Sequence, residues 1–179
     1  SGARSMAGIL SGRINPSGKL AITFPYSTGQ IPIYYNRRKS GRWHQGFYKD
    51  ITSDPFYSFG HGLSYTEFQY GVVTPSSTTV KRGEKLSVEV TVTNVGKRDG
   101  AETVHWFISD PYCSITRPVK ELKHFEKQFI KVGETRTFRF DVDLERDLGF
   151  VDGNGKRFLE AGEYNIWVQD QKVKIELID

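Results

Sequence analysis

The second half of the chain alternates strictly between apolar and polar side chains, and this alternation limits the fold more than any other feature. Over residues 86–93 the apolar positions are Leu86, Val88, Val90 and Val92. Successive side chains of a β-strand point to opposite faces, so the pattern predicts a strand with one buried face and one face in water. The same period returns at 103–108, 138–142, 164–168 and 173–177, and a less regular strand region covers 122–132.

Turn signals separate these segments at the spacing of an all-β domain. Residues 94–96 and Gly133 are typical of turns, 152–155 (Asp-Gly-Asn-Gly) of a hairpin, and 144–148 of a short helical turn. About seven strands in about 110 residues is the size of an immunoglobulin-like antiparallel sandwich. We therefore predict a mainly β fold over 65–179. Phe107 falls on the outward side of its strand, so we expect it to face solvent or an interface.

The first 64 residues have no such period. Ser5–Leu10 is typical of the last turns of a helix, with Gly12 placed to end it. Residues 15–18 (Asn-Pro-Ser-Gly) predict a turn, and 19–24 predict a strand. A helix, a turn and a strand make half of an α/β unit, which cannot cover both faces of its strand. We expect a partial α/β segment that needs a partner, followed over 26–54 by a long loop or a series of short pieces.

Residues 55–71 mark the boundary between these two halves. They are dense in aromatic rings and glycines, and carry no charge between Asp54 and Glu67 if His61 is neutral. Such a segment suits a position between two packed bodies, because glycines let rings and backbone approach closely. From spacing alone, an ordinary aromatic-rich loop over one core is an equally open interpretation.

The charge of the chain is divided unevenly. Residues 1–50 hold eight basic residues and one acidic residue, a net charge of +7, whereas 51–179 hold 17 basic and 20 acidic residues, a net charge of −3. A basic segment is typical of a nucleic-acid arm or of one edge of a larger domain. The basic residues at 37–42 lie beside aromatic rings that could stack on single strands, but no known nucleic-acid module accompanies them. We favour the domain edge and predict no nucleic-acid partner.

Composition excludes several other classes. A chain of 179 residues with 37% hydrophobic residues can build a real core, and its single cysteine, Cys113, excludes an internal disulfide. No apolar run is long enough to span a bilayer and no signal-peptide pattern opens the chain, so any export signal is expected elsewhere.

No group of residues has the pattern of an active site. His44, His61, His105 and His124 have no metal-ligand spacing with one another or with Cys113. No nucleophile elbow or catalytic cysteine motif occurs. We predict no catalytic, substrate-binding or metal site and no cofactor within these residues.

Several motifs of the first half nevertheless resemble the C-terminal region of glycoside hydrolase family 3 in both order and spacing. They are the runs 12–20 (GRINPSGKL), 23–25 (TFP), 29–36 (GQIPIYYN), 40–42 (SGR) and 56–68 (FYSFGHGLSYTEF). The second half resembles the fibronectin type III-like domain of that family at 88–96 (VEVTVTNVG), 100–102 (GAE), 117–125 (RPVKELKHF) and 132–134 (VGE). The resemblance covers essentially the whole chain.

The resemblance implies a three-domain enzyme with a barrel, an α/β sandwich and a β domain. Its retaining chemistry needs an aspartate nucleophile and a glutamate acid/base, two carboxyl groups about 5 Å apart. In the order of the family both lie upstream of Ser1, and 1–49 hold no carboxylate that could replace them. By this resemblance, 1–64 are the C-terminal edge of the α/β domain with its connecting loop, and 65–179 are the fibronectin type III-like domain. Two stretches depart from the family pattern, 104–107 and the more basic 37–39.

Two functions follow as hypotheses. The first is the C-terminal portion of a retaining exo-β-glycosidase, of β-glucosidase or β-xylosidase type, with a structural role and no activity alone. Its partners would be the remainder of the same enzyme and, through it, a β-linked oligosaccharide or glycoside. Homo-oligomer formation stays open, and the habit of the family implies a periplasmic or secreted parent. The alternative is a stand-alone carbohydrate-binding or adhesion module that uses Tyr34, Tyr35, Trp43 and Tyr48.

Overall fold

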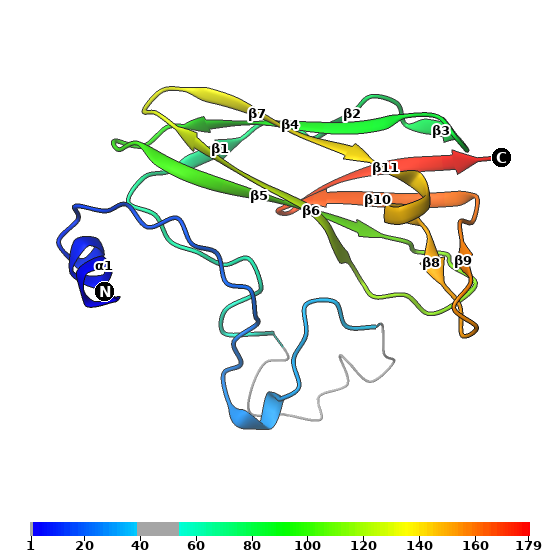
Figure 1. Cartoon of the computed structure of the whole chain (residues 1–179), viewed down its shortest axis with the longest axis horizontal. Helices are drawn as coiled ribbons and strands as arrows, with labels where there is room; N and C mark the ends of the chain where they lie inside the picture. The colour runs from blue at the N-terminus through cyan, green and yellow to red at the C-terminus, as the bar shows by residue number, and fades with distance from the viewer. Residues whose placement is uncertain (1, 39–53) are drawn as a thin grey trace.

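The computed structural model describes residues 2–38 and 54–179. From Phe68 onward the chain forms two layered β-sheets, and the described residues before it run along one side of these layers (Figure 1). The mainly β sandwich predicted from the alternation is confirmed.

The two sheets differ in size and order. In the smaller sheet, β4 (Leu86–Asn94) pairs with β1 (Phe68–Tyr70), β2 (Thr74–Pro75) and β7 (Thr135–Val142). The larger sheet has the order β3 (Thr79–Lys81), β11 (Gln171–Ile178), β10 (Gly162–Val168), β5 (Gly100–Ser109) and β6 (Glu121–Ile130). All of these pairs are antiparallel except β3 with β11.

The alternation fixes which side chains fill the space between the sheets. Val88, Val90 and Val92 on β4 are at most 1% exposed. The inward positions of β5, β7, β10 and β11 meet them in one cluster, whose largest members are Trp106, Tyr164, Phe138 and Phe140. Burial of this apolar surface is the main favourable contribution to folding of the sandwich.

The strands differ from expectation in number and regularity. The two sheets hold nine strands in the part of the chain described, against about seven expected, because β1, β2 and β3 are only two or three residues long. Strands this short show no readable period. The region at 122–132 forms a full strand, and its irregularity is a register shift opposite Trp106 and Phe107.

The predicted turns of the sandwich are present. Gly133 has φ +74°, and β8 (Phe150–Val151) pairs with β9 (Arg157–Phe158) across the predicted hairpin. Residues Leu144–Leu148 form a single π-helical turn, which begins where the side chain of Asp143 accepts a hydrogen bond from the backbone of Arg146.

The segment before the sandwich confirms one expectation and corrects two. The helix α1 (Gly2–Leu10) ends before Gly12, whose φ of +72° suits glycine. Residues 15–18 form no turn, because the Asn15 side chain bonds to distant backbone groups instead of closing one locally. Residues 19–24 form no strand: only Leu20 and Phe24 make backbone bonds to the stretch 57–61, with no continuous ladder between them.

Within its described residues, the rest of this segment holds one short 3₁₀ turn, Thr28–Gln30. The predicted loop at 26–54 therefore contains short pieces where it is described, and its residues 39–53 lie outside the described ranges. Within residues 2–38 and 54–179, no helix is long and apolar enough to cross a membrane.

Phe138→Ala tests the core. Phe138 is fully buried between the sheets, so its removal should lower the free energy of unfolding by about 3–5 kcal/mol. Urea denaturation followed by tryptophan fluorescence measures this change. Tyr112→Ala is the matched control, because its ring is 81% exposed and its loss should change stability by less than about 0.5 kcal/mol. Equal losses in the two variants would contradict the assigned core.

Candidate functional site: the junction between the N-terminal segment and the sandwich

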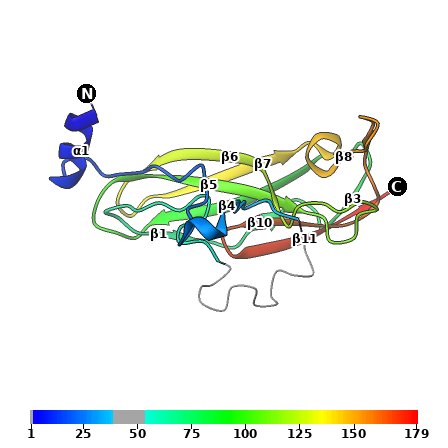
Figure 2. The same ribbon diagram turned by 90° about the horizontal axis from the view of Figure 1, so that it is seen from below.

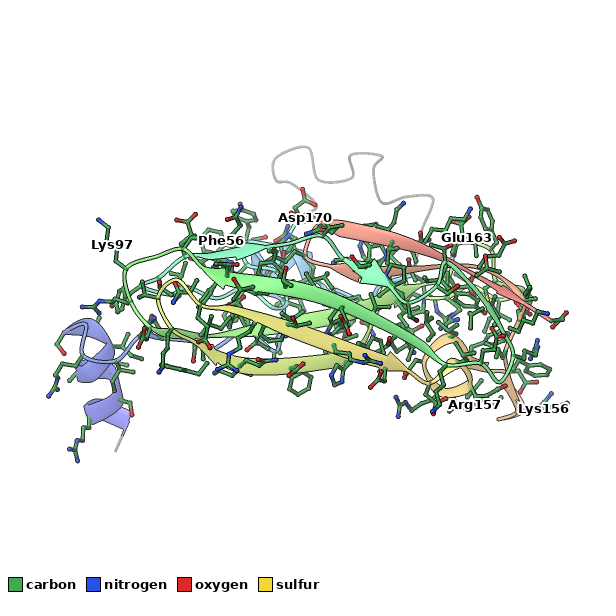
Figure 3. The ribbon with its side chains drawn as sticks, turned by 90° about the horizontal axis from the view of Figure 1, so that it is seen from above. Phe56, Lys97, Lys156, Arg157, Glu163 and Asp170 are labelled. Atoms are coloured by element: carbon green, nitrogen blue, oxygen red, sulfur yellow. The ribbon has the colours of Figure 1, made fainter. Side chains whose placement is uncertain are left out.

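The described residues before the sandwich, 2–38 and 54–66, are called here the N-terminal segment. They run past the sandwich on the side of β5 and β6, and α1 lies beyond one end of it (Figures 1 and 2). In Figure 3 that end also carries Lys97, whereas Lys156 and Arg157 mark the opposite end. The contacts between this segment and the sandwich form the junction.

The side chain of Asn15 holds three separate stretches together. Its Oδ1 accepts hydrogen bonds from the Ser64 hydroxyl at 3.0 Å and the Tyr65 backbone N–H at 2.8 Å. Its Nδ2 donates to the Asp99 carbonyl at 3.0 Å. Asn15 therefore links both halves of the N-terminal segment to the turn before β5.

Asn94 has the corresponding role from within the sandwich. It is fully buried at the end of β4, where its Oδ1 accepts from the Thr66 hydroxyl at 2.7 Å and the Gly96 N–H at 3.1 Å. Its Nδ2 donates to the carbonyls of Arg98 at 2.7 Å and Ile130 at 3.0 Å. Gly96 is required here, because a Cβ would collide with the Thr66 hydroxyl and the Glu67 backbone.

A buried carboxylate provides the ionic part of the junction. Glu102 on β5 is 3.0 Å from the Lys19 ammonium and accepts a 2.8 Å hydrogen bond from the Tyr70 hydroxyl. Burial raises the pKa of Tyr70, and the negative charge of Glu102 raises this pKa further. Because Glu102 is only 5% exposed, loss of Lys19 would leave a buried negative charge with one hydroxyl partner among the bonds described.

Further polar contacts reach the ends of the segment. Arg98 donates to the Gly12 carbonyl at 2.6 Å, and Lys127 on β6 donates to the Ser17 carbonyl at 3.1 Å. Tyr65 donates through its hydroxyl to the Ile9 carbonyl at 2.8 Å, which ties α1 to the residues leading into β1.

An aromatic cluster covers the outward face of β5. Tyr35 stacks on Phe59 with ring centroids 4.3 Å apart, and both rings meet Phe107 edge-on, at 5.8 and 6.2 Å. Phe59 also meets His105 edge-on at 5.8 Å. Burial lowers the pKa of His105, and the nearby charge of Lys19 lowers it further while Glu102 opposes the change. The outward-facing Phe107 therefore lies in an interface, one of the two placements expected for it.

Two family models match this chain on either side of the junction. Residues 1–65 match the glycosyl hydrolase family 3 C-terminal domain, and 102–172 match the fibronectin type III-like domain. The chain belongs to glycoside hydrolase family 3. The resemblance of its motifs to this family is thereby confirmed.

The relatives in the family include enzymes named for two activities. The chain is 40% identical to a periplasmic β-glucosidase of Salmonella typhimurium, over 98% of this chain and 24% of that protein. It is 36% identical to a putative β-xylosidase of Formosa agariphila, over 96% of this chain and 22% of that protein. This family 3 chain thus spans about a quarter of the length of these relatives and aligns with their C-terminal region.

Solved structures of the family share the fold closely. A β-glucosidase from Erythrobacter marinus superposes with a TM-score of 0.94 at 37% identity, over 99% of this chain and 24% of that one. A β-glucosidase from Listeria innocua in complex with glucose gives 0.90 at 36% identity, over 98% of this chain and 26% of that one.

The histidines of this family 3 chain serve packing where they are described. His61 stacks on Tyr57 at 4.7 Å, His124 stacks on Phe140 at 5.1 Å, and His105 lies in the junction. His44 falls outside the described residues. Within 2–38 and 54–179, no group of three or more histidine, cysteine or acidic residues could hold a metal.

Two residues of the carbohydrate-binding hypothesis, Tyr34 and Tyr35, line one cavity of about 290 Å³ together with Phe59 and Lys120. Tyr35 is packed within the aromatic cluster, whereas Tyr34 is 64% exposed. Trp43 and Tyr48 lie in the stretch that is not described. The hypothesis stays a prediction.

Sequence reasoning missed Asn15, Asn94 and Glu102 as junction residues. A signal existed for two of them. Asn94 continues the inward parity of Leu86 to Val92, and Glu102 shares the inward parity of Val104 and Trp106. A polar side chain at an inward strand position needs a partner, and here the partners come from the N-terminal segment, the turn after β4, β1 and the end of β6.

Asn15→Ala tests the first of these links. The variant loses three hydrogen bonds, each with a net value of about 1 kcal/mol, and so should open the N-terminal segment without unfolding the sandwich. Limited proteolysis should then cut within residues 11–20 faster than in the wild type. Ser17→Ala is the control, because only the Ser17 carbonyl is bonded to the sandwich. Unchanged cleavage in Asn15→Ala would contradict the link.

The lowered pKa of His105 predicts a pH dependence. The unfolded chain binds the proton more readily than the folded chain, so stability should fall as the pH drops below the ordinary value of 6.5 towards the folded pKa. His105→Gln removes this contribution, and its unfolding free energy should fall less than that of the wild type between about pH 8 and about pH 5. Urea denaturation across this range measures both curves. Parallel curves would show that His105 does not contribute to the pH dependence of stability.

Proposed function

We propose that this chain is the C-terminal part of a larger retaining exo-β-glycosidase of β-glucosidase or β-xylosidase type. The support is its family, together with relatives of both names that are about four times its length. Residues 1–64 would be the C-terminal edge of the α/β domain, and 65–179 the fibronectin type III-like domain.

The observation that carries the proposal is the two-sided character of the N-terminal segment. One side contacts the sandwich through a hydrogen bond of Asn15, an ion pair of Lys19 and a ring contact of Phe59. Elsewhere it exposes many large apolar side chains, namely Met6, Leu10, Ile14, Ile22, Ile31, Leu63 and others, of which Leu10 and Leu63 are 78% and 75% exposed. So many large apolar side chains exposed within one short segment point to a surface that is covered in the complete protein. A further body of the same enzyme would cover it.

In this arrangement the sandwich holds the last segment of the α/β domain in place rather than performing the chemistry. Retaining hydrolysis requires one carboxylate to form a glycosyl ester and a second carboxyl group, about 5 Å away, to transfer the proton. Glu102, the carboxylate of the junction, is already bound by Lys19 and Tyr70. We assign both catalytic carboxyl groups to the part of the enzyme that precedes this chain.

The substrate would be a β-linked glucoside or xyloside cleaved from its end. A periplasmic or secreted location is proposed for the parent enzyme, since the relative from Salmonella typhimurium is named as periplasmic.

The purified chain should therefore hydrolyse neither 4-nitrophenyl β-D-glucopyranoside nor the corresponding β-D-xylopyranoside. The enzyme produced from the complete reading frame should hydrolyse at least one of them. Release of nitrophenol followed at 405 nm measures both. Activity that co-elutes with the purified chain, and that is absent from a mock purification, would overturn the proposed division of roles.

A further inference from the structure

Strand β6 carries two exposed aromatic side chains on the outward face of the larger sheet. Phe125 is 63% exposed and Phe129 is 56% exposed, and Lys127 lies between them on the same face. Phe125 and Phe129 are called here the β6 patch. β6 is also the last strand of its sheet, because it pairs with β5 alone.

The opposite face of the sandwich has a different character. The outward positions of β4 and β7 carry serine, threonine and charged residues, with Arg139 bonded to Glu89 and Asp141 and Thr93 bonded to Thr135. No large apolar side chain is exposed on either of these strands. That face is polar, as expected of a surface in contact with water. The face of β6, in contrast, carries two exposed phenyl rings beside a strand edge that pairs with no further strand of the described chain.

The β6 patch is continuous with the junction. The ring of Phe125 lies 6.4 Å from the ring of His105, which itself packs against Phe59 of the N-terminal segment. Between the two phenylalanines, Lys127 bonds to the Ser17 carbonyl of that segment. The patch therefore begins at the border of the surface that the N-terminal segment covers.

The position of α1 indicates what would cover the patch. Arg98, in the turn that leads into β5, bonds to the Gly12 carbonyl just after α1, and the end of β6 meets the start of β5 at the same end of the sandwich. Any chain that precedes α1 thus enters beside this end (Figure 3). The relatives have about three quarters of their length outside the matched region.

We propose that the β6 patch is a second docking surface of the sandwich, occupied by the part of the same enzyme that precedes α1. This inference rests on the proposed function. The junction alone joins the sandwich to one narrow segment, about which it could rotate. Contact at Phe125 and Phe129, to one side of that segment, would fix the orientation of the sandwich relative to the catalytic body.

Hydroxyl-radical footprinting of the complete enzyme tests the proposal, with oxidation of each side chain read by mass spectrometry. If the patch is covered, Phe125 and Phe129 should be oxidised several-fold more slowly than in the 179-residue chain. Tyr112, which is exposed in the loop between β5 and β6 and lies outside the patch, should be oxidised at the same rate in both. Buried Trp106 reports in each sample that the sandwich is folded.

Variants of the complete enzyme provide a second measurement. The double variant Phe125→Ser/Phe129→Ser should lower the Tm of the complete enzyme by several degrees and make the sandwich more susceptible to proteolysis. Val72→Ser, at an exposed apolar residue outside the patch, should do neither. Equal oxidation of the two phenylalanines in the chain and in the active enzyme, or a double variant with unchanged Tm, would overturn the docking surface.

Two other outcomes are distinguishable. Protection of the patch in the 179-residue chain that grows with its concentration would overturn the proposal in favour of self-association. Absence of glycosidase activity from the complete reading frame would instead refute the proposed function, whatever the footprint of the patch.

Discussion

The buried amide of Asn94 is the interaction on which the junction most depends. Its oxygen accepts two hydrogen bonds and its nitrogen donates two, so the hydrogen-bonding capacity of the group is used in full. The four partners come from the end of the N-terminal segment, the turn after β4 and the end of β6. A buried amide left without partners costs about 1–3 kcal/mol, so each of these three stretches adds to the stability of the other two. This one side chain therefore helps to fix both the register of β5 against β6 and the path of the chain into β1.

Around Asn94 the junction combines three kinds of contact that fail under different conditions. The Glu102–Lys19 pair depends on charge and is protected from salt by burial. The Asn15 bonds depend on the path of the backbone, and the rings of Tyr35, Phe59 and Phe107 depend on the exclusion of water. This mixture resembles the interface between domains of one chain more than the interior of a single core. Such a mixture of contacts is expected if the N-terminal segment belongs to one domain and packs against another.

Local pattern predicted the sandwich well and the N-terminal segment poorly, for a physical reason. In β4 and β7 each side chain either enters a shared core or lies on the outward face, so a two-residue period is enough to define the strand. Residues 15–24 have no such core: their path is set by side chains such as Ser64 and Glu102, which are distant in sequence. The motifs of the family assigned this segment to the C-terminal region of glycoside hydrolase family 3, which periodicity could not do. Asn94 and Glu102 could have been recognised as polar residues at inward strand positions, but no sequence pattern identifies their partners.

The bonds between the N-terminal segment and the sandwich also set an order for synthesis. A ribosome makes residues 2–66 before the groups that hold them, since Arg98, Glu102 and Lys127 all come later in the chain. Domains begin to fold from the N-terminal side as they emerge. The N-terminal segment therefore lacks these three partners until β6 has been made. A chain cut short before β6 would therefore contain the N-terminal segment but lack both the Lys127 bond to Ser17 and the Asn94 bond to Ile130.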